Sequence, residues 1–228
     1  MKKNLLITTL LCLLAAVSQA TIINVSVDAD TGISNDSNKS ATYVGGEGTW
    51  LETRHYDGVR AKAALFRFDI SSVTDEITSA TFSVDQRSST RSRTYAIYAL
   101  ADGEWDSWDE ATMSYSTAPG MSEPYDDGNL YYDTEMWVKV AEIGVIQNYA
   151  GSLTSTSIDL SCLTADTNDL VTFMIWKETT DSSADTYFAS RESTDGPVGA
   201  TLTLDVVPEP ATMALLGLGG LLLRRRNG

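Results

Sequence analysis

Arginine and aromatic side chains in the middle of this sequence suit the recognition of a sugar. An exposed ring stacks on a sugar ring, and a guanidinium group forms paired hydrogen bonds with a carboxylate such as that of a uronate. We predict sugar contacts from Arg87, Arg91, Arg93, Trp105, Trp108, Tyr131 and Trp137. A wider set of candidates adds Trp50, Tyr132, Arg54, Arg60 and Arg191. The alternative for each residue is a structural role, with the rings in the core and the arginines paired with nearby aspartates.

Acidic side chains near the start and the middle of the chain suggest a second chemistry, the binding of calcium. Calcium prefers several hard oxygen ligands, which carboxylates and amides in loops supply. We predict ligands at Asp28, Asp30, Asp126 and Asp127, with Asn35 and Asp36 as neighbours of the first pair. Neither run has the spacing of an EF-hand loop, so we expect a structural ion that stabilises a small extracellular domain.

Catalytic groups are hard to find in the sequence. His55 is the only histidine, and no Gly-x-Ser-x-Gly motif marks a nucleophile. Asp106, Asp109 and Glu110 form an acidic group that a glycosidase would require. The spacing of this group is also typical of a solvated loop, which we favour. We therefore predict a protein that is not an enzyme.

Charge and cysteine content exclude several other classes of site. The 31 acidic residues outnumber the 16 Lys and Arg residues and give a net charge of −15, which disfavours binding to nucleic acid. Only Cys12 and Cys162 are present, and Cys12 lies in the first apolar run. A mature domain with one cysteine has no internal disulfide and no zinc or iron–sulfur site built on cysteine.

Short alternating stretches predict that the candidate residues are positioned by β-strands. Residues 64–70 are the clearest case, because Leu65 faces one way while Phe66 and Phe68 face the other. We predict strands at 22–27, 50–54, 63–69, 79–84, 94–100, 138–143, 155–160, 170–177, 186–190 and 200–206. This pattern predicts an all-β fold, a two-sheet β-sandwich of jelly-roll type with short helical turns only, over residues 21–206.

Three further features belong to this predicted domain. We assign Phe66, Phe68, Phe82 and Trp176 to a single core. We expect a helical turn at residues 161–166, and a ligand-contacting loop at residues 114–136, the longest irregular stretch.

Residues 1–20 have the pattern of a secretory signal peptide. Lys2 and Lys3 precede an apolar run, and small residues stand before a cut after Ala20. The opposite end, residues 207–228, contains Pro208, Glu209 and Pro210, an apolar stretch of 13 residues and three closing arginines. This order resembles the PEP-CTERM sorting signal of Gram-negative bacteria. The resemblance implies transient anchoring in the inner membrane, recognition by an exosortase-type membrane protease, and delivery to the cell surface or an extracellular matrix.

The central domain has a resemblance of its own. Residues 63–70 contain Arg-Phe-Asp after an apolar pair, and Trp105 to Thr112 precede a proline loop. Ser190-Arg191-Glu192-Ser193 follows near the end of the domain. This order is similar to the DNRLRE-type domain of carbohydrate-binding module family 96. The resemblance implies a β-sandwich that binds polysaccharide, often an acidic one.

We therefore predict an exported, non-catalytic protein of the cell surface or extracellular matrix that binds extracellular polysaccharide. Two alternatives stay open. The first is a purely structural surface protein without a sugar site, and the second is a small polysaccharide-active enzyme that uses Asp or Glu.

Overall fold

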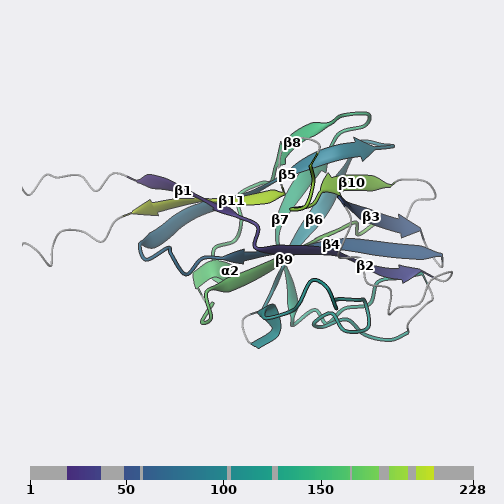
Figure 1. Ribbon diagram of the computed structural model, residues 1–228, viewed down its shortest axis with the longest axis horizontal. Coiled ribbons are helices and arrows are strands. Elements are labelled where there is room, and N and C mark those ends of the chain that lie inside the picture. Colours follow the sequence, from purple (N-terminus) through teal and green to yellow (C-terminus); the bar gives the residue numbers. More distant parts are fainter. Residues whose placement is uncertain are drawn as a thin grey trace, which may run out of the picture.

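The computed structural model describes residues 20–36, 49–56, 59–101, 104–124, 128–164, 166–179, 185–194 and 199–207, and strands make up most of this described part (Figure 1). Among the described residues, strands account for 56% and helices for 4%. The predicted all-β sandwich is confirmed. Residues 1–19 of the predicted signal peptide and residues 208–228 of the predicted sorting segment lie outside the described residues.

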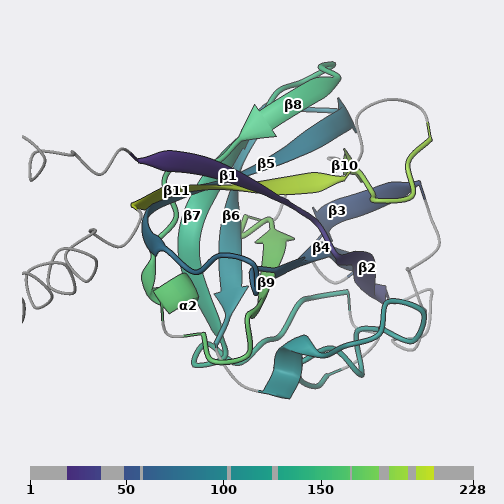
Figure 2. The same ribbon diagram turned by 60° about the vertical axis from the view of Figure 1, so that its left-hand side comes forward.

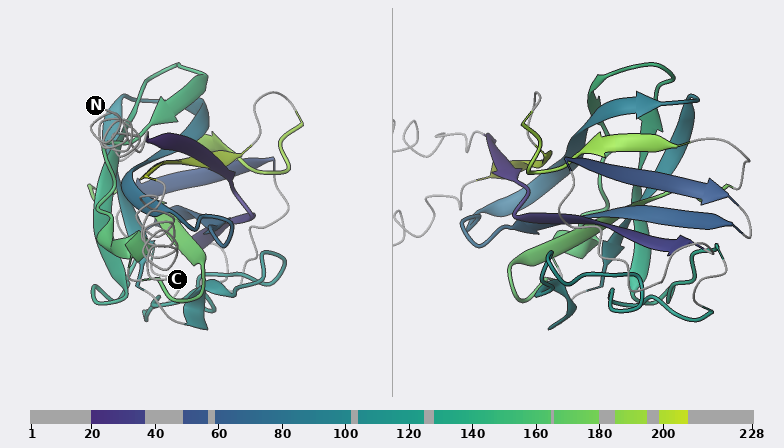
Figure 3. Two further views of the ribbon diagram at one scale, coloured as in Figure 1. Left: turned by 90° about the vertical axis from the view of Figure 1, so that its left-hand side faces the viewer. Right: turned by 45° about the vertical axis from the view of Figure 1, so that its right-hand side comes forward.

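The strands form one curled antiparallel sheet whose two halves face each other (Figure 3). Layer 1 contains β1 (Thr21–Ser26), β11 (Ala200–Val207), β5 (Glu76–Ser89), β10 (Thr186–Ala189) and β3 (Trp50–Tyr56) in that order, with β8 (Gly151–Thr154) paired to β5. Layer 2 contains β4 (Arg60–Asp69), β9 (Leu170–Trp176), β6 (Arg93–Leu100) and β7 (Trp137–Val145), with β2 (Ala29–Asp36) paired to β4. The pairing of β3 with the start of β4 joins the two layers.

The main core fills the space between the layers. Phe66 and Phe68 of β4 point inward as their alternation predicts, and they meet Phe82 of β5 and Phe173 of β9. The four rings form edge-to-face contacts with centroids 5.3–6.1 Å apart. The core assignments of Phe66, Phe68 and Phe82 are confirmed.

A second core, which we did not predict, lies on the outer face of layer 2. The irregular segments 104–124 and 128–136, with the short helix η1 (Glu104–Asp106), cover this face below β4, β9 and β2 in Figures 1 and 2. Tyr115 of the first segment is fully buried, and Trp176 of β9 is buried against these segments rather than in the main core. The larger side chains of the predicted ligand-contacting loop 114–136 therefore serve packing.

Two of the strand predictions were wrong. Residues 29–36, which we expected to be a loop with calcium ligands, form the buried strand β2. Their Asp, Gly and Asn residues have low strand propensity, but the ladder with β4 and the covering segments override it. Residues 155–160 are not a strand, because the amide of Ser155 bonds to β5 and that of Thr156 bonds to β7. A short helix, α2 (Ser161–Thr164), confirms the expected helical turn.

Candidate functional site

A tryptophan and an arginine stack on the outer surface of layer 1. Trp50, the first residue of β3, keeps 46% of its surface exposed. The guanidinium carbon of Arg87 lies 5.1 Å from the centroid of a Trp50 ring, which is a cation–π arrangement. Arg87 Nη2 also donates a hydrogen bond to Ser193 Oγ. The stack is therefore held from the turn that follows β10.

Strand geometry explains why these two side chains meet. Leu51 points into the core, so its neighbour Trp50 points outward. The register between β5 and β10 shifts between Tyr187 and Phe188, whose partners in β5 are Ser88 and Gln86. Arg87 lies between those partners at the irregularity. A β-bulge of this kind re-aims a side chain, and here it accompanies the stack on Trp50.

Two other arginines of the wider set are engaged in ion pairs nearby. Arg54 Nε lies 3.0 Å from Asp185 Oδ1. Arg60 Nε lies 3.2 Å from Asp36 Oδ2, a carboxylate that is almost fully buried. Both follow the structural alternative, in which arginines pair with aspartates.

Arg91 and Arg93 follow Arg87 in the sequence, where the chain passes from β5 of layer 1 to β6 of layer 2. Arg91 is exposed in the turn, where its carbonyl oxygen accepts a hydrogen bond of 2.7 Å from Ser89 Oγ. Arg93 is half-buried at the start of β6. The three predicted arginines thus lie at the end of β5 and the start of β6, two strands that do not pair with each other, and the roles of Arg91 and Arg93 in binding stay predictions.

Trp108 and Trp137 belong to the second core. Trp137 is 1% exposed, and its Nε1 donates to the Pro119 carbonyl over 2.8 Å. Trp108 is 8% exposed, and its Nε1 donates to Thr172 Oγ1 over 3.0 Å. Their hydrogen-bonded and buried indoles offer no open face to a sugar, so we reassign both residues from sugar contact to packing.

Trp105 and Tyr131 have different surroundings from these two. Trp105 is 57% exposed in η1, so its ring is open to solvent. Tyr131 is half-buried, and its backbone amide donates to the hydroxyl of Tyr115 over 2.8 Å. Of the four predicted aromatic contacts, Trp105 therefore has the most open ring.

Three carboxylates meet at the start of β2. One oxygen from each of Asp30, Glu110 and Glu192 lies within 4.8 Å of the others. Asp30 is 1% exposed and lies on β2, whereas Glu110 follows η1 and Glu192 lies in the turn after β10. The cluster therefore joins three segments that are far apart in the sequence.

Two arginines lie beside the carboxylates. Arg191 Nη2 is 2.9 Å from Glu110 Oε2, and its Nε is 2.8 Å from Glu192 Oε1. The backbone amide of Arg191 donates to Asp30 Oδ2 over 2.6 Å. Arg67 Nη2 lies 2.5 Å from Asp28 Oδ2. Asp28, a predicted calcium ligand, thus uses its carboxylate in an ion pair on the surface.

The environment of the cluster disfavours the charged forms of two carboxylates, those of Asp30 and Glu110. Burial raises the pKa of Asp30 from 3.8 to about 7, with further contributions from Glu192 and Glu110, and the Arg191 amide opposes the rise. Burial, followed by the charge of Glu192, also raises the pKa of Glu110. Asp126 and Asp127, the other predicted calcium ligands, lie outside the described residues.

One short turn connects the carboxylates to the Trp50–Arg87 stack. Residues 190–193 form a turn in which the Ser193 amide donates to the Ser190 carbonyl over 3.1 Å. Arg191 and Glu192 contact the carboxylate cluster, while Ser193 accepts the hydrogen bond from Arg87. The outer aromatic surface and the acidic cluster therefore share a structural support.

One known protein family has a model that matches nearly the whole of the domain described above. The family model of carbohydrate-binding module family 96 matches residues 21–204. The chain belongs to carbohydrate-binding module family 96. Membership indicates a carbohydrate-binding role for this family 96 domain. No curated protein matches the chain.

A second family model matches the end of the chain. The PEP-CTERM protein-sorting motif covers residues 206–226, which include the predicted sorting residues Pro208, Glu209 and Pro210. The motif indicates export, anchoring in a membrane before processing and a location at the cell surface. It also implies processing by an exosortase. Residues 208–228 lie outside the described residues, and no helix within the described part is long and apolar enough to cross a membrane.

The candidate catalytic groups of the family 96 domain take part in hydrogen bonds and packing within the fold. His55 Nδ1 lies 3.1 Å from the Lys177 carbonyl oxygen, and its ring centroid lies 4.6 Å from that of Trp176. Asp106 is 1% exposed. Asp109 is exposed, and its Oδ1 accepts the Ala111 amide at 3.0 Å. These contacts tie the groups to the backbone and to packing.

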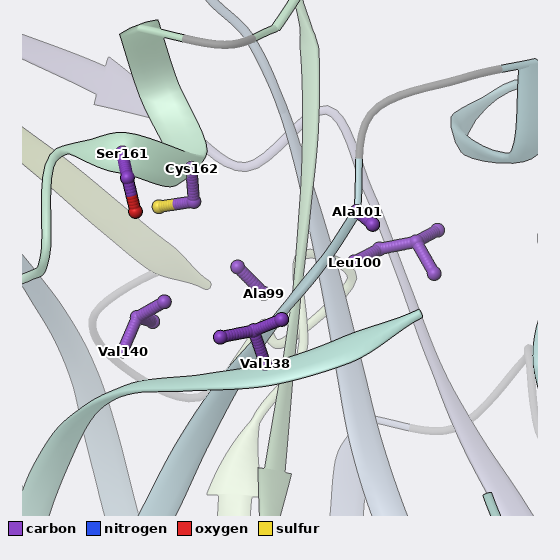
Figure 4. A pocket seen from close by; sticks show the side chains of 7 residues that line it. All are labelled: Ala99, Leu100, Ala101, Val138, Val140, Ser161 and Cys162. Atoms are coloured by element: carbon purple, nitrogen blue, oxygen red, sulfur yellow. The ribbon is translucent and has the colours of Figure 1, made fainter. Parts of the chain in front are cut away.

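A small apolar pocket lies between β6, β7 and α2, away from the charged groups. Its volume is about 240 Å³, and Figure 4 shows its lining residues Ala99, Leu100, Ala101, Val138, Val140, Ser161 and Cys162. Burial raises the pKa of the Cys162 thiol to about 12, so the thiol stays protonated. The pocket therefore has little polar character with which to orient a sugar.

The residues that the structure brings together were only partly found from the sequence. Trp50 was in the wider set of aromatics, and its place at the start of an alternating strand was the signal for an outward ring. Glu110 and Glu192 were noted in the motifs of the family resemblance but not as metal ligands. Their meeting with Asp30 had no local signal.

Proposed function

We propose that this protein is a non-catalytic surface protein that binds polysaccharide on the outer face of layer 1. The observation that supports the proposal is the exposed ring of Trp50 with the Arg87 guanidinium beside it. An aromatic face and a cation in one place suit a sugar ring that has a carboxylate. Membership in a family of carbohydrate-binding modules adds to this support.

Acidic polysaccharide is the class of ligand that we propose for this surface. The protein has a net charge of −15, so a polyanion is repelled by most of its surface. A local guanidinium is needed to offset this repulsion, and Arg87 provides it next to the ring. A neutral glucan lacks the carboxylate that would pair with Arg87, so it should bind more weakly.

We propose the absence of catalysis on the burial of Asp30, the acidic group with the raised pKa. Asp30 has a raised pKa like that of many general acids, but its side chain is 1% exposed. A polysaccharide chain needs direct contact with a general acid, which a carboxyl buried under a turn does not offer. The three carboxylates are better placed to hold the turn 190–193 than to cleave a glycosidic bond.

Affinity electrophoresis of the purified protein in gels with polyuronate or neutral glucan tests the proposal. We expect retardation by polyuronate and strong loss of retardation in Trp50→Ala, whereas loss in Trp105→Ala alone would place the sugar at the other exposed indole. Retardation that Trp50→Ala leaves intact would overturn the proposed surface. The absence of retardation by every polysaccharide would favour a purely structural role, and release of reducing ends would favour an enzyme.

A further inference from the structure

The spacing of the three carboxylates at the start of β2 fits a single metal ion. Two oxygens on opposite sides of a calcium ion at 2.3–2.6 Å are about 5 Å apart. The oxygens of Asp30, Glu110 and Glu192 lie within 4.8 Å of one another. Smaller angles between ligands give shorter separations, so all three oxygens can reach one ion without a large movement of the backbone.

The oxygen Oδ1 of Asp30 is independent evidence for a ligand at this place. Asp30 is 1% exposed, and its Oδ2 accepts the Arg191 amide. Its other oxygen, Oδ1, is buried and has no hydrogen-bond partner among the described residues. A buried carboxylate oxygen without a partner is costly, because it has lost its hydration without replacement. A cation in contact with this carboxylate would remove that cost.

The charges around the cluster do not balance. Four carboxylates, those of Asp28, Asp30, Glu110 and Glu192, meet two guanidinium groups, those of Arg67 and Arg191. When all four are ionised, two negative charges have no counter-charge in this group. A divalent ion supplies the two positive charges that are needed.

We propose that Asp30, Glu110 and Glu192 bind one divalent cation, with calcium preferred over magnesium. Oxygen-only ligands from three separate segments of the chain suit calcium, which tolerates irregular geometry, whereas magnesium demands a near-ideal octahedron. The carbonyl oxygen of Asp28 accepts a hydrogen bond from Arg191 Nη1, so it is a further oxygen donor at this place. The site differs from the predicted set, in which Asp28, Asp126 and Asp127 were partners of Asp30.

The cation would link distant segments of the chain. Asp30 is fixed in β2 by its pairing with Phe66 of β4. Glu192 lies in the exposed turn 190–193. An ion that binds the native arrangement and not the unfolded chain raises stability in proportion to the logarithm of its concentration. The proposal does not depend on sugar binding, because the ion is detected by stability alone.

Thermal unfolding of the purified full chain in EDTA, in calcium and in magnesium tests the proposal. We expect calcium at a hundredfold excess over its Kd to raise the Tm by about 5–10 °C, and magnesium to raise it less. Isothermal titration calorimetry with calcium alone should give one site per chain. An unchanged Tm in about 10 mM calcium would overturn the proposal.

Two variants separate ligation from a merely structural role. Glu192→Gln alters an exposed turn, so we expect it to fold and to lose the calcium-dependent rise in Tm. Asp30→Asn removes a buried charge, so we expect a Tm in EDTA at least equal to that of the unmodified protein and again no rise with calcium. The matched control Glu142→Gln, which removes an exposed carboxylate 2.9 Å from Lys139, should keep the rise. A rise in Glu192→Gln equal to that of the unmodified protein would contradict the assignment.

Discussion

Arg87 on β5 lies over the ring of Trp50 on β3, with its guanidinium carbon 5.1 Å from the ring centroid. The strand β10 separates β3 from β5 in the sheet, so the contact reaches across a neighbouring strand. The stack keeps one face of the indole beside a positive charge. Removing the positive charge of Arg87 therefore tests whether the ligand of this surface is acidic.

Replacing Arg87 by glutamine should weaken the binding of polyuronate about tenfold and leave any binding of neutral glucan nearly unchanged. The guanidinium pairs with a carboxylate, which only the uronate has. Titration calorimetry at low and high salt checks this, because binding by the unmodified protein should weaken more with salt. Arg60→Gln is the matched control. Equal loss for the charged and the neutral polymer would indicate that Arg87 acts only through the shape of the surface.

Removing divalent cations should lower the affinity for polyuronate several-fold. The turn 190–193 contains Glu192, a proposed cation ligand, and Ser193, which accepts a hydrogen bond from Arg87. Loss of the cation would loosen this turn and the support of the stack. Binding measured in EDTA and after calcium is restored checks the coupling. If calcium raises the Tm while affinity for the polymer stays constant, the two sites are independent.

Gly120→Ala should destabilise the fold by about 1–3 kcal/mol. Gly120 has φ of +63°, and an added Cβ would lie 3.1 Å from Trp137 Nε1 and Cδ1. The substitution therefore strains the backbone and disturbs a ring of the second core. Urea unfolding measures the change. The control Gly144→Ala has open space around the new methyl group and should change stability by less than about 0.5 kcal/mol. Similar effects of both substitutions would contradict the assigned packing.

Cys162 should react with iodoacetamide at pH 8 at least about a hundredfold more slowly in the folded protein than in the denatured chain. Burial raises the pKa of its thiol to about 12, and Asp159 adds to the rise, so almost no thiolate is present at this pH. Mass spectrometry of the peptide with Cys162 follows the reaction. Comparable rates in the two states would show that the thiol is open to solvent.

Local patterns in the sequence were sufficient for the strands whose two faces differ in character. Phe66 and Phe68 alternate with Leu65 and Arg67, and this period of two fixes which side chains face the main core. Composition and the order of charged and apolar stretches likewise predicted a signal peptide at one end of the chain and a sorting signal at the other. These properties depend on neighbours in the sequence, so no tertiary contact is needed to infer them.

Tertiary structure alone decided which aromatic rings are open and which acids meet. Trp105 and Trp108 stand three residues apart in one irregular segment, yet the first is 57% and the second 8% exposed. A segment without a regular period has no face that a pattern could predict, so only its packing on layer 2 buries Trp108. Asp30 meets Glu110 and Glu192 because β2, η1 and the turn after β10 converge. Long-range strand pairing brings these segments together, and no pattern among neighbouring residues in the sequence indicates it.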